Sequence, residues 1–452
     1  MITVELKNWG VASPQELTSF GALMCSSPAT PPWREIINTK KELFDKGHHT
    51  TFQHFHLSFV IDGIAVGDVT FGLHLANVFY NTSQRSGRLA KDMFANPDIA
   101  MFMAYIDKFW PLAPSVRTHV LAYLTYGFDM YGRFLEQAGG VAARFLREER
   151  PHLSIGKIEG LKGKIAQEQM RMFIPVIFPT GLLYTLNLSA LAAMHAVAWS
   201  PSMREVTNLM AQEVLGKWPE LAFLFERRKW PDEEPSAGTV VGMSPMRNGV
   251  VYEPSLSVLR LDDMPGKKNR ISSDDMHPLD LLPFSPEHMN LNVYEIKSQV
   301  EMSTATLGQK QRHRTIKRGA PVFTGGFYLP PILQELKLEH EASDMLDRWL
   351  SLRSNVPPGL FTILAPYGAT VAHEEIASYN AVIHEASDRG CFKAQEEVYA
   401  LSVSQIKQVD GTMLANHLKP PCVMCGVCGE GRGYCGRDLK KLSEDPFPKR
   451  RV

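Results

Sequence analysis

Residues 309–315 read Gln-Lys-Gln-Arg-His-Arg-Thr, residues 47–54 read Gly-His-His-Thr-Thr-Phe-Gln-His, and residues 81–85 read Asn-Thr-Ser-Gln-Arg. Six of the nine positions 310–318 are basic in a chain whose 48 basic and 48 acidic residues otherwise balance. Arginine makes planar, bidentate contacts to phosphate, so this run predicts an anion site, although a solvated helix end is the simpler alternative. The histidine segment could start a helix with Thr50 as its cap, or hold a metal. No cysteine or carboxylate at matching spacing supports the metal.

Taken together, the three segments resemble the signature of the flavin-dependent thymidylate synthases. In that family a Gln-x-x-Arg-His-Arg run, a Gly-His-x-Thr-x-Phe-x-His segment and a Ser-x-Arg tail lie in one short subunit. Here they are spread over two halves of a chain of 452 residues. The resemblance covers about residues 20–230 and 285–405. It implies an α+β chain made of two fused, diverged copies of the family fold.

The resemblance assigns a flavin-binding role to residues from both halves. By position they are His48, Thr50, Gln53, Arg312, His313, Arg314, Asn187 and His384. The family has Glu where Gln53 stands, and Asn where His384 stands.

Each half keeps a different part of the nucleotide-binding signature. An ungapped alignment places Leu73-His74-Leu75 on Arg-His-Arg, whereas Ser83 and Arg85 keep the Ser and Arg positions. The second half keeps Gln309 and Arg312 but has Gly-Ala-Pro-Val-Phe-Thr (319–324) where the Ser-x-Arg tail should stand. We therefore expect one composite nucleotide site and one dead one. The substrate-binding residues of the composite site are Gln309 and Arg312 from the second half and Asn81, Ser83, Gln84 and Arg85 from the first.

Two further arginines match family positions. Arg389, in Arg-Gly-Cys-Phe-Lys-Ala-Gln-Glu-Glu (389–397), matches the Arg that helps ionise the pyrimidine ring nitrogen, so the resemblance makes it the catalytic residue. A preorganised cation is suited to stabilise developing negative charge. The family's second phosphate Arg is Thr362 in the second half but Arg171 in the first. Either Arg171 is a vestige or it serves a changed site as a substrate-binding residue.

Composition shifts divide the chain into four parts. We expect a first copy at 1–230, a linker with a short strand at 231–284, a second copy at 285–415 and a four-cysteine tail at 416–452. Hydrophobic periodicity predicts helices that include 332–353 and 374–385. The uncharged stretch 172–199 is long enough to span a bilayer, but its prolines, Asn187 and His195 favour a buried core helix.

Four cysteines lie within fourteen residues: Cys422, Cys425, Cys428 and Cys435. Glycines between them allow tight turns, so four thiolates can close a tetrahedral zinc site. An iron–sulfur cluster is the alternative, although the last gap is longer than in ferredoxins. Cys25 and Cys391 are expected to be ordinary buried thiols.

The balanced charge predicts no general attraction to nucleic acid or to a membrane surface. The N-terminal residues lack an apolar signal segment, which favours a cytoplasmic protein. The resemblance implies reductive methylation of dUMP at C5, with FAD, NADPH and methylenetetrahydrofolate, in a homodimer of these two-copy chains. Two alternatives stay open: modification of another pyrimidine nucleotide, because Asn81 and Thr362 depart from the pattern, and a non-catalytic protein that binds flavin or nucleotide.

Overall fold

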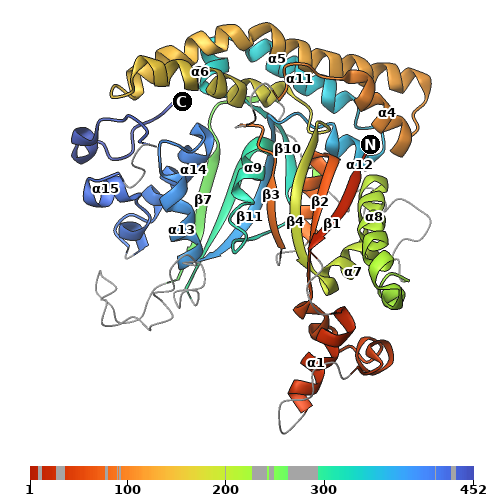
Figure 1. Cartoon of the computed structure of the whole chain (residues 1–452). Coiled ribbons are helices and arrows are strands. Elements are labelled where there is room, and N and C mark those ends of the chain that lie inside the picture. The colour runs from red at the N-terminus through yellow and green to blue at the C-terminus, as the bar shows by residue number, and fades with distance from the viewer. Residues whose placement is uncertain are drawn as a thin grey trace, which may run out of the picture.

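Two β-sheets lie side by side in the computed structural model, and long helices cross above both of them (Figure 1). Helices α4, α5, α6 and α11 form this upper layer, α13 to α15 lie on one flank, α7 and α8 lie on the other, and α1 projects below. The structure describes residues 1–8, 13–26, 36–76, 80–88, 90, 93–198, 200–226, 242–243, 249–262, 294–412, 414–428 and 434–452.

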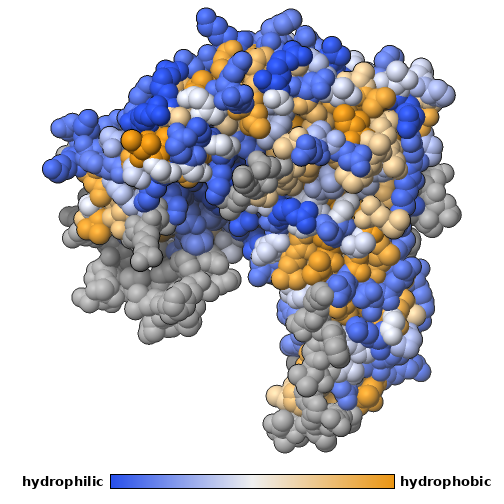
Figure 2. All heavy atoms as spheres, turned by 45° about the horizontal axis from the view of Figure 1, so that its top comes forward, coloured by the Kyte–Doolittle hydropathy of each residue, from blue (hydrophilic) through white to orange (hydrophobic). Residues whose placement is uncertain are grey.

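The first sheet has four antiparallel strands in the order β1-β2-β4-β3. Their bounds are β1 Thr3–Asn8, β2 His56–Ala65, β3 Tyr80–Gln84 and β4 Pro179–Asn187. Alternation explains β2, because Leu57, Phe59 and Ile61 are fully buried while Val60 between them is exposed. Val60 lies opposite Leu183, which is also exposed. A hydrophobic patch is visible on the face of the molecule below the helical layer (Figure 2).

The second sheet contains the same antiparallel order, β7-β8-β11-β10. These strands are β7 Ser255–Leu261, β8 Glu295–Ser303, β10 Val322–Tyr328 and β11 Ala369–Ser378. Two short strands, β5 (Gly242–Met243) and β6 (Gly249–Val251), add in parallel to β10. The two-residue strand β9 (Lys317–Arg318) pairs antiparallel with β11. In each sheet the last long strand along the chain, β4 in the first and β11 in the second, lies inside the sheet rather than at its edge.

Helices follow the strands in a matching order in each half. The first half has α1 Pro14–Ser26, α2 Val66–Asp68, α3 His74–Ala76, α4 Ile99–Phe109, α5 Pro114–Glu149, α6 Ile155–Met170, α7 Leu188–Val197 and α8 Pro201–Lys217. Short irregular helices are η1 Thr39–Phe44, η2 His49–His54, η3 Val69–Leu73, η4 Arg171–Phe173 and η5 Pro219–Leu224. The second half has α9 Thr304–Lys310, α10 Pro331–Glu335, α11 Glu339–Ser351, α12 Pro358–Ile363, α13 Tyr379–Arg389 and α14 Glu396–Gln408. The tail carries η10 Leu414–His417, α15 Pro421–Cys425 and η12 Leu439–Ser443.

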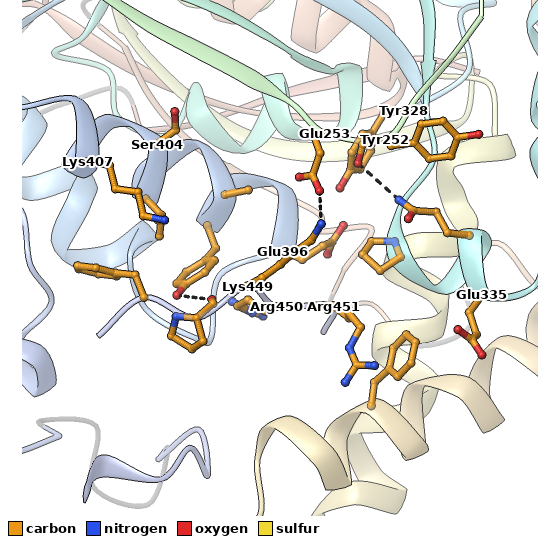
Figure 3. A pocket seen from close by; sticks show the side chains of 18 residues that line it. Tyr252, Glu253, Tyr328, Glu335, Glu396, Ser404, Lys407, Lys449, Arg450 and Arg451 are labelled. Atoms are coloured by element: carbon orange, nitrogen blue, oxygen red, sulfur yellow. Dashed lines mark hydrogen bonds and ion pairs between the residues drawn. The ribbon is translucent and has the colours of Figure 1, made fainter. Parts of the chain in front are cut away.

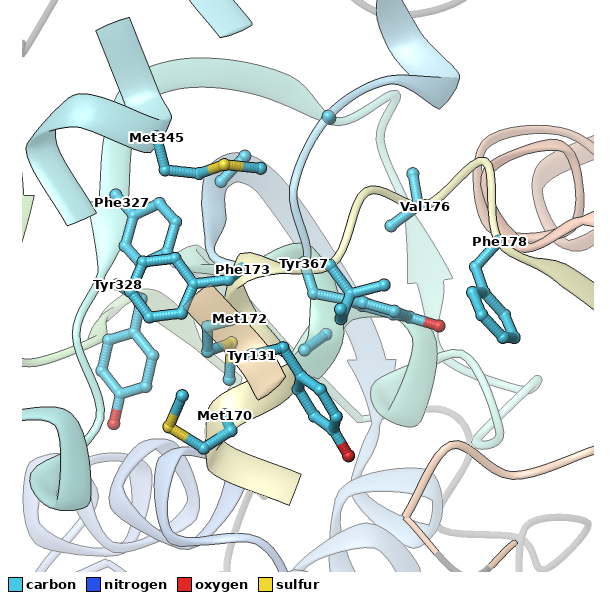
Figure 4. Close-up of a cluster of buried hydrophobic side chains, with 14 of the residues drawn as sticks. Tyr131, Met170, Met172, Phe173, Val176, Phe178, Phe327, Tyr328, Met345 and Tyr367 are labelled. Atoms are coloured by element: carbon cyan, nitrogen blue, oxygen red, sulfur yellow. The ribbon is translucent and has the colours of Figure 1, made fainter. Parts of the chain in front are cut away.

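The two halves meet where their proline-containing turns pair. Pro175 and Pro366 form an antiparallel bridge, flanked by a hydrogen bond from Val176 N to Ala365 O (2.8 Å) and one from Tyr367 N to Ile174 O (2.9 Å). Buried aromatic and methionine side chains from both halves surround this crossing (Figure 4). One continuous core therefore holds the halves in a fixed relation.

Several helix predictions are wrong in the same way. Residues 172–198 form a turn, strand β4 and helix α7 rather than one helix, and residues 374–378 belong to β11. The predicted helix 332–353 is split between α10 and α11 at Lys337, whose φ of 57° is left-handed. The residues of β4 are mostly apolar although Leu183 on one face is exposed, so the alternation of burial in the strand is not visible as an alternation of residue type. Within the described ranges no helix is long and apolar enough to cross a membrane.

The predicted linker is partly strand. Its short strand is confirmed as β7, and β6 lies just before it. Residues 231–241, 244–248 and 263–284 of the predicted linker lie outside the described residues. The C-terminal residues pack onto the helical layer, where Arg451 Nε contacts Glu149 Oε1 (2.7 Å) and Val452 is buried.

Candidate functional site

A pocket lies between the two halves and is lined by polar residues from both. Its cavity of about 70 Å³ is lined by Val66, Thr70, Gln84, Arg85, Ser86, Gly87, Arg88, Arg171, Thr304, Ala305, Gly308, Gln309, Arg312 and Tyr367. A volume of this size suits a phosphate-sized group rather than a whole nucleotide, because pockets that enclose a whole small-molecule ligand are roughly 300 Å³ or larger. The structure thus brings together Gln84, Arg85, Arg171, Gln309 and Arg312, five residues predicted from the sequence.

The first half supplies its share from the end of β3 and from η4. Gln84 ends the strand, and Arg85 follows with its guanidinium 3.4 Å from Asp62 and half exposed. Arg171 is 4% exposed, lies 5.1 Å above the Tyr367 ring, and donates from Nη2 to Gln395 Oε1 at 3.1 Å. Arg171 is therefore held in the pocket rather than displaced from it.

The second half supplies Gln309 and Arg312 from the end of α9. Ser303 caps this helix by accepting from Thr306 N (3.1 Å), and the carboxylate of Glu397 accepts from Ser303 N, Ser303 Oγ and Thr306 Oγ1. A cap that is itself held by a buried carboxylate fixes where the helix begins. The position of Gln309 and Arg312 at its far end follows from that start.

The six basic positions at 310–318 do not form one anion site. Lys310 contacts both Glu385 (3.0 Å) and Glu375 (3.2 Å), and Arg318 contacts Glu375 (3.0 Å), with all four side chains nearly buried. His373 Nε2 lies 3.1 Å from the same Glu375 carboxylate. Burial alone would raise the pKa of Glu375, but Lys310 and Arg318 hold it well below its usual range. Lys310 and Arg318 are thus neutralised inside the fold, and of the six only Arg312 lines the pocket.

Gln395 connects the two sets of pocket residues. Its Oε1 accepts from Arg171 of the first half and from Gln309 Nε2 of the second. Three buried atoms around it, Arg171 Nε, Gln309 Oε1 and Gln395 Nε2, have no hydrogen-bond partner within the described part of the chain. Buried polar groups are normally satisfied, so these atoms point to a bound polar ligand.

The electrostatics of the pocket favour an anion. Arg88 is paired with Glu168, and its Nη2 also donates to Lys393 O at 3.3 Å. Burial lowers the pKa of Arg171 and that of Arg389. The positive charges of Arg88 and Arg312 lower the pKa of Arg389 further. A depressed arginine pKa shows that its charge is held at a cost, which a phosphate or carboxylate would offset.

Arg389, the predicted catalytic residue, does not line this pocket and is oriented by a histidine. Its Nε donates to His313 Nε2 at 3.0 Å, and the His384 ring lies 5.4 Å from that of His313. Burial lowers the pKa of His313 to about 2, with the positive charges of Arg389 and Lys310 contributing. The imidazole is therefore neutral, with Nε2 as acceptor and the proton on Nδ1.

The residues assigned to flavin are not all gathered at this pocket. Arg314 Nη2 donates to Thr82 O at 2.9 Å and so crosses from one half to the other. His48 and Gln53 are exposed around η2, and Asn187 accepts from Ala190 N at 2.8 Å to cap α7. Gln84 of the pocket pairs with Leu182 on β4. Asn187 lies five residues further along the same strand, so it is roughly 16 Å away from Gln84 along the sheet. The side chain of Thr50 lies outside the described structure, and its backbone belongs to η2 rather than to a cap.

Apolar side chains stand at two positions, Leu73 and Phe323, that the ungapped sequence alignment pairs with Arg312 and Gln84. Leu73 and Phe323 are fully buried, and Phe323 packs on Phe71 (5.4 Å) and Trp349 (4.9 Å). Thr362 is buried and donates to Pro358 O within α12.

From the sequence, no role was predicted for two residues that line the pocket and for one, Gln395, that bonds to its lining. Two predicted substrate-binding residues and the predicted catalytic Arg389 do not line it. Asn81 and Ser83 are exposed on β3 and do not line the pocket. Arg88, Gln395 and Tyr367 take part in the pocket but were given no role. Arg88 follows Arg85 by three residues, and Gln395 lies in the segment that carries Arg389, so both were close to the signal that was used.

The four tail cysteines are not arranged as a closed site within the residues that the structure describes, which contain no group of three or more metal-ligating side chains. Cys435 is buried, Cys425 is exposed, and Cys422 and Cys428 are half-buried, all as free thiols. Burial raises the pKa of Cys422, and the neighbouring Cys391, Cys435 and Cys428 raise it further. Cys391, expected to be an ordinary thiol, thus belongs to the same neighbourhood.

Comparison with protein families matches residues 12–220 to the family described as "Thymidylate synthase complementing protein". The resemblance to the flavin-dependent thymidylate synthases is confirmed over this stretch. The match ends before Arg312-His313-Arg314, so it covers the first of the two halves. None of the curated proteins compared with the chain matches it significantly.

Solved structures also match half of the chain. The thymidylate synthase ThyX of Helicobacter pylori, described with FAD and dUMP, has 15% identity and a TM-score of 0.33, and the match covers 50% of this chain and 97% of that one. The UMP/dUMP methylase PolB of Streptomyces cacaoi, with 5-Br dUMP, has 16% identity and a TM-score of 0.31, covering 48% and 91%. Values this low carry no argument about the chemistry of the present chain.

Proposed function

We propose that this chain is a flavin-dependent methyltransferase of the thymidylate synthase type, which methylates dUMP at one composite site per chain. The observation that carries the proposal is the pocket between the halves, where Gln84, Arg85 and Arg171 face Gln309 and Arg312. The family match over residues 12–220 supports the reaction class.

In this proposal the phosphate of the nucleotide lies among Arg171, Arg312 and Gln309, and the nucleoside part extends out of the small cavity. Arg389 stabilises negative charge on the pyrimidine ring, and neutral His313 keeps its guanidinium oriented. Bound FAD would supply the redox and one-carbon chemistry, with NADPH as reductant and methylenetetrahydrofolate as carbon donor. His48, Gln53, Asn187, Arg314 and His384 would hold the flavin.

The proposal includes duplication of the family fold. It is supported by the shared order β1-β2-β4-β3 and β7-β8-β11-β10, and by the pairing of equivalent proline turns at the centre. A homodimer would cover the exposed Val60 and Leu183 of the first sheet. Asn81 is exposed to solvent and the pocket does not enclose the base. Another pyrimidine nucleotide therefore stays an alternative substrate to dUMP. Turnover assays with dUMP, UMP and dCMP in parallel decide which pyrimidine nucleotide is used.

One nucleotide and bound FAD per chain are the expected results for purified protein. Isothermal titration with dUMP should give a stoichiometry near one, because the apolar Leu73 and Phe323 stand at the positions that the alignment pairs with Arg312 and Gln84. A flavin spectrum on reconstitution with FAD should accompany it. Two equivalent sites would contradict the composite site, and no uptake of FAD would contradict the enzyme.

About one zinc per chain is expected in the four-cysteine tail, since four thiolates make one tetrahedral site. Replacing Cys422 by Ser should lower the zinc content in elemental analysis, and replacing Cys25 should not. If the tail becomes ordered only when zinc binds, the free energy of zinc binding contributes directly to folding of the tail. Iron with acid-labile sulfide would contradict the zinc assignment.

A further inference from the structure

A second and larger cavity, of about 660 Å³, lies apart from the nucleotide pocket (Figure 3). Its walls come from α14, from α10, from the turn at Tyr252 and Glu253, and from the C-terminal residues 447–451. This volume falls in the range of cavities that hold cofactor-sized molecules. None of the residues assigned to the nucleotide or to flavin lines it.

The interior of this cavity combines aromatic walls with a buried carboxyl group. Tyr328 and Tyr399 are 3% exposed, and Tyr252 is half exposed at the mouth. Glu396 is 3% exposed, and its Oε1 has no hydrogen-bond partner among the described residues. Burial raises the pKa of Glu396 to about 8, and the neighbouring Glu168 and Glu397 raise it further. A carboxyl group held in this way gains from a ligand that donates hydrogen bonds to it.

The rim of the cavity is basic. Lys407 is exposed at one side, and Lys449 and Arg451 stand on the C-terminal segment. Lys449 is paired with Glu253, and Arg451 is paired with Glu148 and Glu149, so Lys407 is the rim cation with no ion pair recorded in the described structure. The cavity therefore presents a buried carboxyl group together with the buried Arg450, which lowers the pKa of that carboxyl group, aromatic rings along its sides and a cation at its mouth.

We propose that this cavity is a second small-molecule site, for a planar heteroaromatic compound with an amidine-like N–H edge and an anionic group at its opposite end. The N–H edge pairs with Glu396, the ring lies against Tyr328 and Tyr252, and the anionic end meets Lys407. The site adjoins the nucleotide pocket through the chain, since Gln395 binds Arg171 and Gln309 and Glu396 follows it directly. It does not depend on the proposed methylation of dUMP.

The test uses the full-length protein and three fluorescent probes. 2-Aminobenzimidazole-5-carboxylate carries both features, benzimidazole-5-carboxylate lacks the amidine-like edge, and 2-aminobenzimidazole lacks the anion. The first should bind tightest, and each of the others should bind roughly tenfold more weakly. Equal affinity for all three probes, or no binding at millimolar concentration, would overturn the proposal.

Three substitutions assign the binding to this cavity. Glu396→Gln should remove the advantage of the amidine-like edge, Lys407→Ala should weaken only the carboxylate probes, and Tyr252→Ala, at an exposed position, should weaken all three. Lys440→Ala, outside the cavity, is the matched control and should change none of the affinities. Saturating dUMP, and the Arg312→Ala variant, should leave probe binding intact. Displacement by dUMP would place the probe in the nucleotide pocket instead and refute a second site.

Discussion

Replacing Lys310 by Met should lower the free energy of unfolding by about 3 to 5 kcal/mol, the cost of breaking a buried ion pair from one side. Lys310 lies between the carboxylates of Glu375 and Glu385, and its side chain is 5% exposed. Its removal leaves two buried carboxylates with Arg318 as the remaining cation that contacts them in the described structure. Urea denaturation of both proteins, followed by circular dichroism, gives the difference.

Lys317→Met is the matched control, because it makes the same substitution seven residues later at a side chain that is 76% exposed. Its ion pair with Glu295 is long (3.9 Å), so stability should change by less than about 1 kcal/mol. Equal effects of the two substitutions would show that the network at Glu375 is not what fixes this segment. The pKa of Glu375 is lowered in the fold, so its contribution is present at neutral pH and is lost as the pH falls below the range of a free carboxyl group.

Replacing Arg312 or Arg171 by Ala should each weaken dUMP binding by about 2 to 4 kcal/mol, measured by isothermal titration. Both residues line the small cavity, and each would make a charge-assisted contact to the phosphate of dUMP in the proposed complex. Arg85 also lines the pocket, but it is half exposed and paired with Asp62, so its loss should cost less.

Arg353→Ala provides the control, since Arg353 is exposed in the second half and lies outside the pocket. It should bind dUMP as tightly as the unaltered protein. Thermal unfolding of each variant separates loss of binding from loss of folding, which matters most for the buried Arg171. Wild-type affinity in a folded Arg312→Ala protein would refute the composite site.

The resemblance to the flavin-dependent thymidylate synthases located the substrate-binding residues in the sequence, and the structure brings five of them to one pocket. Gln309 and Arg312 in one half and Gln84 and Arg85 in the other are separated by more than two hundred positions, and the complementary losses indicated that they meet. The role of Arg171 stayed open, because the half that keeps Arg312 has Thr362 at this family position, so that Arg171 of the other half could be a vestige or part of a changed site. Its 5.1 Å contact with Tyr367 and its bond to Gln395 depend on three-dimensional packing.

The basic run at 310–318 shows the opposite case. Its charge density predicted one anion site, but Glu375 and Glu385, from β11 and α13, neutralise Lys310 and Arg318. These partners are 57 to 75 residues away along the chain. No local pattern distinguishes a cation that is paired in the interior from one that is free to bind a ligand.

By itself, the sequence determined which residue types the protein has for holding an anion, that they are divided between two halves, and where most amphipathic helices lie. Only the tertiary structure decided that β4 and β11 are central strands and that the two proline turns pair. It also decided that Phe323 packs against Trp349 in the core and that five of the predicted polar residues line one pocket. The physical reason is that periodicity reports which face of an element is buried, whereas strand pairing, charge neutralisation and cavity formation depend on partners distant in the chain.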